Sequence, residues 1–410
     1  MGKKSLSTES YKGVRDFYPE DMFIEKYIFG KIRETVENFG YVEYGASPLE
    51  ESELYRQKSG EEIVNEQTYS FKDRGDRDVT LRPEMTPTTA RMVAKKRREL
   101  AFPLRWYSIT NMFRYERPQR GRLREHFQLN VDLFGVEGIE AEIETITLAS
   151  KILKDFGLKE ENFEIQINSR KLLEKAYEPI LKNKELFPVM LRLLDKKEKM
   201  GVDKFELEWK KLFKEPFEET KNYECPELKR ILEILDKRGI KTKLNPYLVR
   251  GFDYYTDIVF EVFDTNPENR RSLFGGGRYD ELLSLFGEEN IPAVGFGMGD
   301  VTLKNTLETY DLLPQYASSV DIYLCIVEKE YTEAADTLAS SLREKGLNVA
   351  VNYTYRKIGD QIKNANKEGA PYVVCVGKKE AETLRFELKE LSTGKIEELS
   401  TEKIPDAIQK

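Results

Sequence analysis

The 410-residue chain contains one histidine, His126, and three cysteines, which stand far apart at positions 225, 325 and 375. These counts exclude a metal site built from several histidines or from closely spaced cysteines, and they argue against a serine–histidine or cysteine–histidine catalytic pair. Any chemistry must therefore depend on carboxylates, arginines and a bound cation. Few, separated cysteines also fit a reducing compartment, so we expect a cytoplasmic protein.

Long apolar runs and an excess of positive charge are also missing. No stretch approaches the roughly 20 apolar residues that a membrane span requires, and the first ten residues lack the apolar core of a signal peptide, so no membrane partner is expected. The net charge is -7, and contact with a nucleic acid would therefore need a local basic patch. The length and the 40% hydrophobic content allow two or three folded domains.

The stretch from Leu104 to Gly135 predicts two strands joined by an arginine-rich loop. Apolar and polar residues alternate along it, and strand side chains alternate between faces, so one face carries a row of hydrogen-bonding groups. This pattern indicates a site for a polar, anionic ligand, although a solvated outer face with a basic turn would produce the same alternation. The polar row comprises Ser108, Thr110, Arg114, Glu116, Arg124, His126, Gln128, Asn130 and Asp132, and the loop adds Arg117, Gln119, Arg120 and Arg122.

Two further segments bring polar groups next to predicted strands. Glu84 follows a predicted hairpin in a loop held by two prolines. Its carboxylate either binds a ligand or stabilises the N-terminus of the next helix. The segment 248–255 (LVRGFDYY) places Arg250 and two tyrosines at the entrance of a strand. A charge that enters a buried strand needs a counterion or a ligand.

Glycine is concentrated in two late segments. Residues 274–280 (FGGGRYD) contain three consecutive glycines, which allow close approach of the backbone but are most often turns. Residues 293–299 (AVGFGMG) alternate glycine with larger residues before a helix, whose N-terminus favours anions. Neither a P-loop nor a dinucleotide fingerprint applies, because the required lysine and setting are missing.

The remaining chain predicts three regions. Residues 169–240 are almost entirely helical and charged without catalytic spacing, and we interpret them as a helical insertion between two parts of a core, 1–168 and 241–310. Beyond a linker, strands alternate with helices over 320–410, which predicts a small, mostly parallel, three-layer α/β domain. This domain shows no catalytic cluster and is interpreted as a binding module.

Five motifs and the final α/β domain resemble the histidyl-tRNA synthetases, which are class II aminoacyl-tRNA synthetases. The resemblance covers nearly the whole chain: helix 19–39 with Pro48 is similar to motif 1 of the class, the arginine-rich hairpin to motif 2, and 293–303 to motif 3. It implies an α+β catalytic domain with a six-stranded antiparallel sheet, the helical insertion, and an anticodon-binding domain at 320–410. The five motifs are RPEMT (82–86), FRYERPQRGRLREHFQLNVDLFG (113–135), LVRGFDYY (248–255), GGGRYD (275–280) and AVGFGMG (293–299).

The resemblance implies a histidine–tRNA ligase, a homodimer that activates histidine with ATP and Mg²⁺ and transfers it to tRNA(His). Arg114 would hold the α-phosphate, and Arg250 would stabilise the charge that develops as the histidine carboxylate attacks it. This reaction needs positioning and charge neutralisation more than proton transfer, which suits a chain with one histidine. The resemblance implies that Glu84, Thr86, Gln128, Asp132, Arg250, Tyr254 and Tyr255 bind histidine, that Arg114, Glu116, His126, Gly297 and Gly299 bind ATP, and that Arg117 and Gln119 grip the acceptor end of tRNA.

Two positions depart from the family pattern. The phenylalanine that the family stacks on adenine corresponds to His126, and the alternation places His126 on the ligand face and Phe127 on the core face unless the strand is slipped or bulged. Motif 3 ordinarily ends in an arginine for the γ-phosphate, but Thr302 stands at that position here, with Lys304 and Arg278 as candidate substitutes. The loss of one such charged contact costs on the order of 1.5–3 kcal/mol.

Two other interpretations are weighed. A synthetase-like paralogue serves as the regulatory subunit of ATP phosphoribosyltransferase in histidine biosynthesis, and the missing motif 3 arginine points toward it. Arg114, Glu116 and Arg250 argue against it, as does the C-terminal domain, which that paralogue lacks. A class II synthetase for proline or threonine is disfavoured by LVRGFDYY. Without the resemblance, the residues support only an anion-binding sheet and an α/β module.

Overall fold

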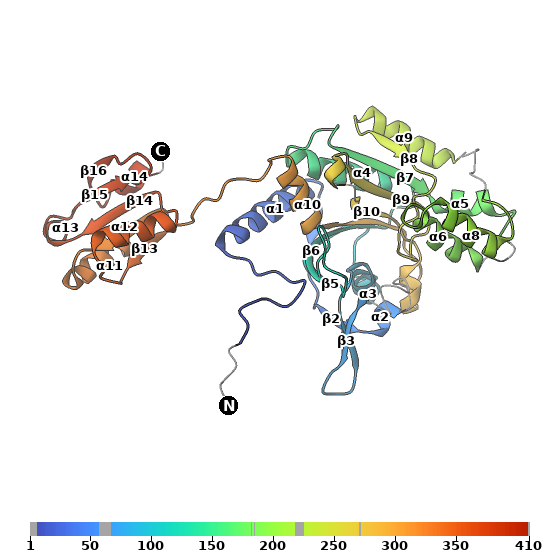
Figure 1. Cartoon of the computed structure of the whole chain (residues 1–410), viewed down its shortest axis with the longest axis horizontal. Coiled ribbons are helices and arrows are strands. Elements are labelled where there is room, and N and C mark those ends of the chain that lie inside the picture. The colour runs from blue at the N-terminus through green and yellow to red at the C-terminus, as the bar shows by residue number, and fades with distance from the viewer. Residues whose placement is uncertain are drawn as a thin grey trace. The chain divides into compact units, whose positions relative to one another are not determined.

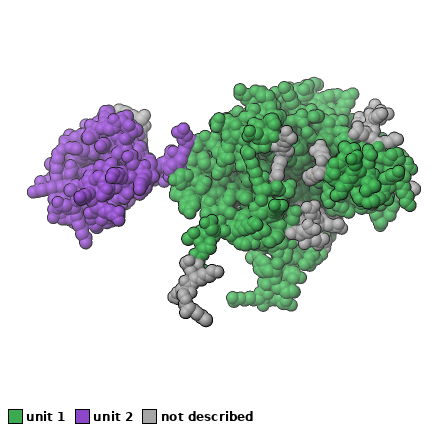
Figure 2. Space-filling view, viewed as in Figure 1, with its two compact units in different colours: residues 1–314 green, residues 315–410 purple. Residues whose placement is uncertain are grey.

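The computed structural model describes residues 6–56, 67–181, 183, 185–217, 225–269 and 272–408. The chain divides into two compact units, residues 1–314 and 315–410, which Figure 2 shows in different colours. Figure 1 traces the helices and strands of each unit in chain order. None of the helices among the described residues is long and apolar enough to cross a membrane.

The first unit is built on an eight-stranded sheet with the order β1-β5-β6-β11-β10-β9-β7-β8 (Figure 1). Its six inner strands are antiparallel, and the two short edge strands pair in parallel, so the predicted six-stranded antiparallel sheet is confirmed. In sheet order the strands are β1 (Val42–Glu43), β5 (Leu104–Phe113), β6 (Glu125–Phe134), β11 (Ala293–Gly299), β10 (Ser272–Arg278), β9 (Ile258–Asp264), β7 (Phe163–Ser169) and β8 (Thr242–Leu244).

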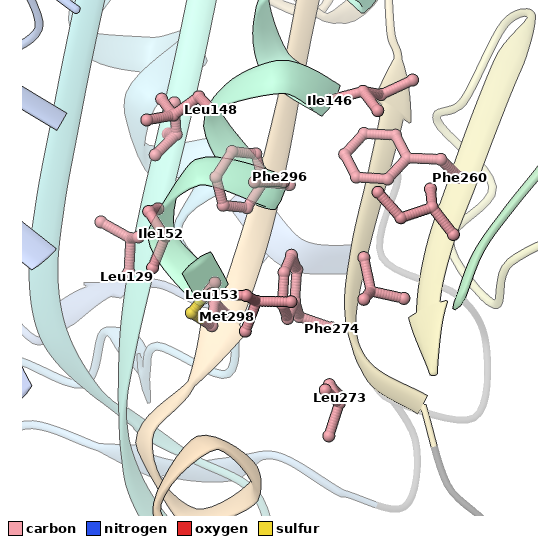
Figure 3. Packing of buried hydrophobic residues seen from close by; sticks show 14 of the residues in the cluster. Leu129, Ile146, Leu148, Ile152, Leu153, Phe260, Leu273, Phe274, Phe296 and Met298 are labelled. Atoms are coloured by element: carbon pink, nitrogen blue, oxygen red, sulfur yellow. The ribbon is translucent and has the colours of Figure 1, made fainter. Parts of the chain in front are cut away.

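Helices cover one face of this sheet. α4 (Glu140–Asp155) lies across β6 and β11, and α1 (Pro19–Asn38) and α10 (Asp300–Thr309) pack beside it. Fully burying an apolar side chain contributes about 1.5–3 kcal/mol, so this cluster holds the helices on the sheet. Figure 3 shows Phe260, Phe274, Phe296 and Met298 of the sheet beside Ile146, Leu148, Ile152 and Leu153 of α4, all within one buried cluster.

The opposite face carries fewer elements. A small sheet, β2 (Leu49–Glu51), β4 (Asp78–Leu81) and β3 (Tyr69–Lys72), leads into α3 (Thr86–Lys96), after the short helix α2 (Glu53–Arg56). α3 and α4 lie on opposite sides of the main sheet in Figure 1. Ala90 and Val93 of α3 pack in a second buried cluster with Tyr254, Tyr255 and Tyr279, which leaves the polar row of β6 facing a cavity.

Five helices lie among the described residues between β7 and β8. Three of them, α5, α6 and α8, enclose a separate buried cluster around Trp209, which Val249 also joins. Ile231 and Leu235 of α9 belong instead to the cluster under the main sheet. The interval 169–240 therefore contains a small helical body and one helix of the main core. The helices are α5 (Arg170–Tyr177), α6 (Leu186–Asp195), α7 (Lys197–Met200), α8 (Val202–Phe213) and α9 (Pro226–Lys237).

The second unit is a five-stranded sheet with the order β13-β12-β14-β15-β16, parallel over its first three strands. α11 (Thr332–Glu344) and α14 (Ile404–Ile408) pack on one face and α12 (Ile358–Lys367) on the other, so the three-layer α/β prediction is confirmed. α13 (Lys378–Thr383) and α14 were not predicted, because both are too short for a periodic signal. The strands are β12 (Ile322–Ile326), β13 (Val349–Asn352), β14 (Tyr372–Val376), β15 (Arg385–Glu390) and β16 (Ile396–Ser400).

Candidate active site

The polar face of the main sheet borders two adjoining pockets, which share Arg114, Gln128 and Gly297 in their linings. All five predicted ATP-binding residues line the second pocket, together with Thr302. Of the seven predicted histidine-binding residues, all but Asp132 line the first pocket. The two sets, which come from segments as far apart as residues 84 and 299, therefore meet at one place. The first pocket contains Glu84, Thr86, Gln128, Arg250, Tyr254 and Tyr255, and the second Arg114, Glu116, His126, Gly297 and Gly299.

The glycines of β10 and β11 allow side chains to lie across the sheet. A Cβ atom on Gly297 would stand 2.4 Å from Gln128 Nε2, and one on Gly295 would stand 2.6 Å from Asp132 Oδ1. On the neighbouring strand, a Cβ atom on Gly275 would stand 2.9 Å from Arg250 Nη1. The glycine pattern that the sequence shows is therefore a requirement of the pocket floor and not of a turn.

Arg250 enters the first pocket from the loop before β9. Its Nη1 donates to Oε1 of Glu261 at 2.6 Å, and its backbone adopts a left-handed φ of 60°. Burial is the largest single influence and acts to lower the pKa of Arg250, but Glu261 together with Tyr255 and Tyr254 outweighs it, and the pKa is raised above its ordinary value. The guanidinium is thus charged and oriented by a contact within the protein.

A carboxylate and two phenols line the other side of the first pocket. The Tyr254 hydroxyl donates to Oε2 of Glu84 at 3.1 Å and lies 3.4 Å from Oγ1 of Thr86. Burial, and then the charge of Glu84, raise the pKa of Tyr254 well above its ordinary value, so this phenol is a neutral donor at pH 7. Glu84 is therefore part of the pocket, which favours the ligand interpretation of this residue over that of a helix-start acid.

Asp132 lies behind the first pocket. Its carboxylate accepts a hydrogen bond from Tyr279, whose ring lines the pocket. Burial raises the pKa of Asp132 to about 7, and the bond from Tyr279 opposes this rise only in part. The structure thus connects Asp132 to the cavity through Tyr279, and a direct contact between Asp132 and histidine stays a prediction.

The pairing of β5 with β6 separates His126 from Phe127. The register runs without a break from Leu104–Phe134 to Phe113–Glu125, so no slip or bulge reverses the two faces. Phe127 packs edge-on against Phe29 of α1, with ring centroids 5.3 Å apart, whereas His126 lines the second pocket. Burial, followed by the charges of Arg114 and Arg15, lowers the pKa of His126 to about 3, so the imidazole is neutral.

Thr302 lines the second pocket but directs its hydroxyl at the backbone, 2.9 Å from the carbonyl oxygen of Leu273. Neither proposed substitute for the missing arginine faces this pocket. Arg278 is bound through two nitrogens to the Glu142 carboxylate of α4, at 2.6 and 2.7 Å, on the helix-covered face. Lys304 lies 3.8 Å from Asp21 of α1. The expectation that either replaces the motif 3 arginine is therefore wrong. Arg122 lines this pocket instead.

The loop between β5 and β6 borders a wide groove next to the second pocket. Gln119 and Arg122 line this groove with Lys197 and Lys243, whereas Arg117 is exposed on the loop and contributes to neither ligand pocket. The groove lining is polar and includes two acids, Asp195 and Glu261, beside the three cations.

The first pocket also includes residues that were not predicted to bind histidine or ATP. Phe252 stacks on Tyr254 with ring centroids 5.2 Å apart, and the Arg114 guanidinium lies 5.9 Å from the Phe252 ring. Asn130, Tyr279 and Phe296 also line this pocket. Each belongs to a motif or to the polar row already noted, so membership of the motif was a usable signal.

Comparison with known proteins decides the family. A family model described as histidyl-tRNA synthetase matches residues 13–301, and a model described as an anticodon binding domain matches residues 321–410. The chain belongs to the histidyl-tRNA synthetase family. The resemblance predicted from the five motifs is thereby confirmed.

Relatives within the histidyl-tRNA synthetase family match over nearly their full length. The histidine–tRNA ligase of Leptospira biflexa is 41% identical, covering 96% of this chain and 95% of its own. That of Thermoplasma volcanium is 38% identical, covering 96% of each chain. The crystal structure of apo histidyl-tRNA synthetase from S. aureus superposes with a TM-score of 0.79 at 26% identity, covering 98% of this chain and 100% of that one.

Proposed function

We propose that this protein is a histidine–tRNA ligase that activates histidine with ATP to histidyl-adenylate and transfers it to the 3′ end of tRNA(His). The observation that carries the proposal is the pair of adjoining pockets, which join the two predicted ligand sets at Arg114, Gln128 and Gly297. Relatives named histidine–tRNA ligase match through both units, so the regulatory-subunit alternative is not favoured.

Activation would take place where the pockets join. Arg114, which lines both, would bind the α-phosphate, and Arg250 would stabilise the negative charge that develops as the histidine carboxylate attacks and pyrophosphate leaves. ATP would arrive as its Mg²⁺ complex. Within the described ranges no group of three or more His, Cys, Asp or Glu could hold a metal, so phosphate oxygens would supply most of the ligands.

Histidine would lie with its ring among the aromatic residues of the first pocket. Tyr254 and Thr86 offer hydroxyl groups to the imidazole nitrogens, with Tyr255 beside them, while Glu84 and Gln128 would bind the α-amino group. An amino acid without the ring nitrogens would leave these polar groups unpaired, which is a strong basis for rejecting it.

The tRNA would contact both units. Arg117 and Gln119 would grip the acceptor end, and residues 320–410 would bind the anticodon.

The proposed domain organisation is a catalytic core of residues 1–168 and 241–310, with an insertion at 169–240. A homodimer is also proposed; Val42 and Leu49, near motif 1, expose 63% and 45% of their surface and suit an apolar interface. A cytoplasmic location stays a prediction.

Arg122 is the cation best placed to replace the motif 3 arginine. It lines the second pocket with Thr302, and its Nη1 lies 3.2 Å from Glu116. We expect Arg122→Ala to raise the KM for ATP about 10-fold in pyrophosphate exchange, because one charged phosphate contact is lost. The neighbouring Arg120→Ala variant is the control, and equal ATP KM values in the two variants would reject the assignment.

His126 is expected to stack on adenine as a neutral ring. His126→Ala should raise the KM for ATP about 10-fold, whereas His126→Phe should stay near wild type, since base stacking contributes about 1–3 kcal/mol.

Between pH 6.5 and about 3 the unfolded chain binds a proton at His126 that the folded chain does not, so stability decreases as the pH falls. His126→Phe should therefore lose about 2 kcal/mol less than wild type between pH 7 and 4.5 in urea unfolding. Identical pH dependence would contradict the neutral imidazole.

The proposed function is tested by histidine-dependent exchange between ATP and pyrophosphate in the presence of Mg²⁺, with proline and threonine as control amino acids. We expect exchange with histidine alone. The absence of exchange with any of the three, in a folded preparation, would favour the regulatory subunit, and exchange with proline or threonine would reassign the substrate.

A further inference from the structure

Arg170, the first residue of α5, is almost fully buried although it belongs to neither ligand pocket. Its guanidinium lies inside the loop that carries Arg250. Nε and Nη2 donate to the carbonyl oxygen of Val249 at 3.2 and 2.9 Å, and Nη2 also reaches those of Arg250 and Phe252 at 3.2 and 2.7 Å. Nη1 donates to the carbonyl oxygen of Tyr255 at 2.9 Å and lies 3.4 Å from that of Asp253.

The residues on either side of Arg170 hold the ends of the same loop. Asn168 Nδ2 donates to the carbonyl oxygen of Leu248 at 2.9 Å. At the other end, Ser169 Oγ donates to Asp257 Oδ1 at 2.6 Å, and Lys171 forms an ion pair with Asp257 at 3.0 Å. Residues 168–171 therefore hold the loop 248–257 at its start, its middle and its end.

The loop needs such support, because Arg250 has a left-handed φ of 60°. This conformation is unfavourable for a residue with a side chain and persists only where surrounding contacts impose it. The carbonyl of Arg250 itself is one of those that Arg170 binds. Burial lowers the pKa of Arg170 to about 10, so its charge is retained at neutral pH and the carbonyl dipoles balance it.

We propose that Arg170 is a positioning residue for amino acid activation, which holds the loop 248–257 so that Arg250, Tyr254 and Tyr255 face histidine. The inference rests on the proposed function. Because Arg170 begins the first helix of the insertion, and Val249 packs into the core of that helical body, the position of the insertion is coupled to the amino acid pocket. ATP contacts come from other strands and depend less on this loop.

The test compares Arg170→Lys with Arg105→Lys in the full-length chain. Lysine keeps the buried charge but lacks the planar fork that binds several carbonyls at once. The Arg105 guanidinium is also bound through two nitrogens, both at 2.7 Å, but its partner is the Glu144 carboxylate of α4. We expect Arg170→Lys to raise the KM for histidine about 10- to 100-fold, leave the KM for ATP within about twofold, and speed hydrogen exchange of peptides covering 248–257. Arg105→Lys should change none of these.

A double-mutant cycle separates positioning from general destabilisation. In an Arg250→Ala background, Arg170→Lys should lower the rate of pyrophosphate exchange by a smaller factor than in the wild-type background, because one of the three side chains that it positions is gone. If Arg170→Lys does not fold, Asn168→Ala replaces it. Its amide tethers Leu248 while its Oδ1 is buried without a partner, so alanine removes an unsatisfied acceptor and should be tolerated.

The proposal would be overturned by any one of three results for Arg170→Lys. These are equal changes in the KM for histidine and the KM for ATP, a lower fraction of active enzyme with no other change, and unchanged hydrogen exchange of the peptides covering 248–257. The hydrogen-exchange measurement does not depend on catalysis. If the wild-type chain shows no histidine-dependent pyrophosphate exchange, the proposed function fails. The hydrogen exchange of peptides 248–257 would still show whether Arg170 holds the loop.

Discussion

Arg250→Ala is expected to lower the rate of histidine-dependent pyrophosphate exchange about 10²–10³-fold, because it removes the oriented cation from the position where charge develops. Glu261 holds this guanidinium at 2.6 Å, so the cation is oriented by a contact within the protein itself. A preorganised charge of this kind acts on the transition state more than on the bound substrates, and the loss should therefore fall mainly on kcat.

The design must separate lost catalysis from lost stability. Removing Arg250 leaves the Glu261 carboxylate without its partner in a site where both side chains are more than four-fifths buried, which destabilises the fold. Arg250→Ala combined with Glu261→Gln avoids this unpaired charge and should show the same catalytic defect. Arg192→Ala is the matched control, since Arg192 lies 3.6 Å from Asp253 in the same loop but is 41% exposed. The assignment of Arg250 would be falsified if both Arg250 variants kept wild-type exchange; sedimentation would show whether the substitutions change the oligomeric state.

Gly276→Ala is expected to destabilise the first unit by about 3 kcal/mol or more. The added Cβ atom would stand 2.0 Å from the carbonyl oxygen of Gly295 and 2.6 Å from Cβ of Phe296, and neither can move without separating β10 from β11. This separation would open the sheet beneath both pockets. Urea unfolding, followed by a probe in the first unit, measures the change.

The control for this substitution is Gly30→Ala in α1, where the added Cβ atom meets nothing within 4 Å. Alanine is favoured over glycine inside a helix by about 0.8–1 kcal/mol, so this variant should be stabilised. A Gly276→Ala protein as stable as wild type would mean that β10 and β11 lie farther apart than described.

Much of the pocket floor was predictable from the sequence. The faces of β6 follow from a period of two, so the placing of His126 and Gln128 required only an unbroken strand, which the register confirms. The same alternation also indicates the face on which Arg278 lies. This residue shares its strand parity with Phe274 and therefore points to the helix-covered face. The prediction for Arg278 was wrong because this alternation directs its side chain away from the pocket, toward Glu142 of α4.

Other features depended on contacts between distant segments. Asp132 lies on the expected face of β6, but its carboxylate accepts a hydrogen bond from the hydroxyl of Tyr279, which follows β10. Arg170 gave no local signal, because its partners are peptide carbonyls about 80 residues away. Only the pairing of β7 with β9, which sets Ser169 opposite Ile258, brings them together.

The sequence by itself determined the family, the order of the motifs, and which side chains of each strand share a face. These properties are local, since they depend on residue type and on a two-residue period. The tertiary structure alone decided which polar groups meet, which cation lines the second pocket in addition to Arg114, and what holds the Arg250 loop. Those contacts are set by strand register and side-chain packing between segments that are remote in the chain, and no local pattern encodes them.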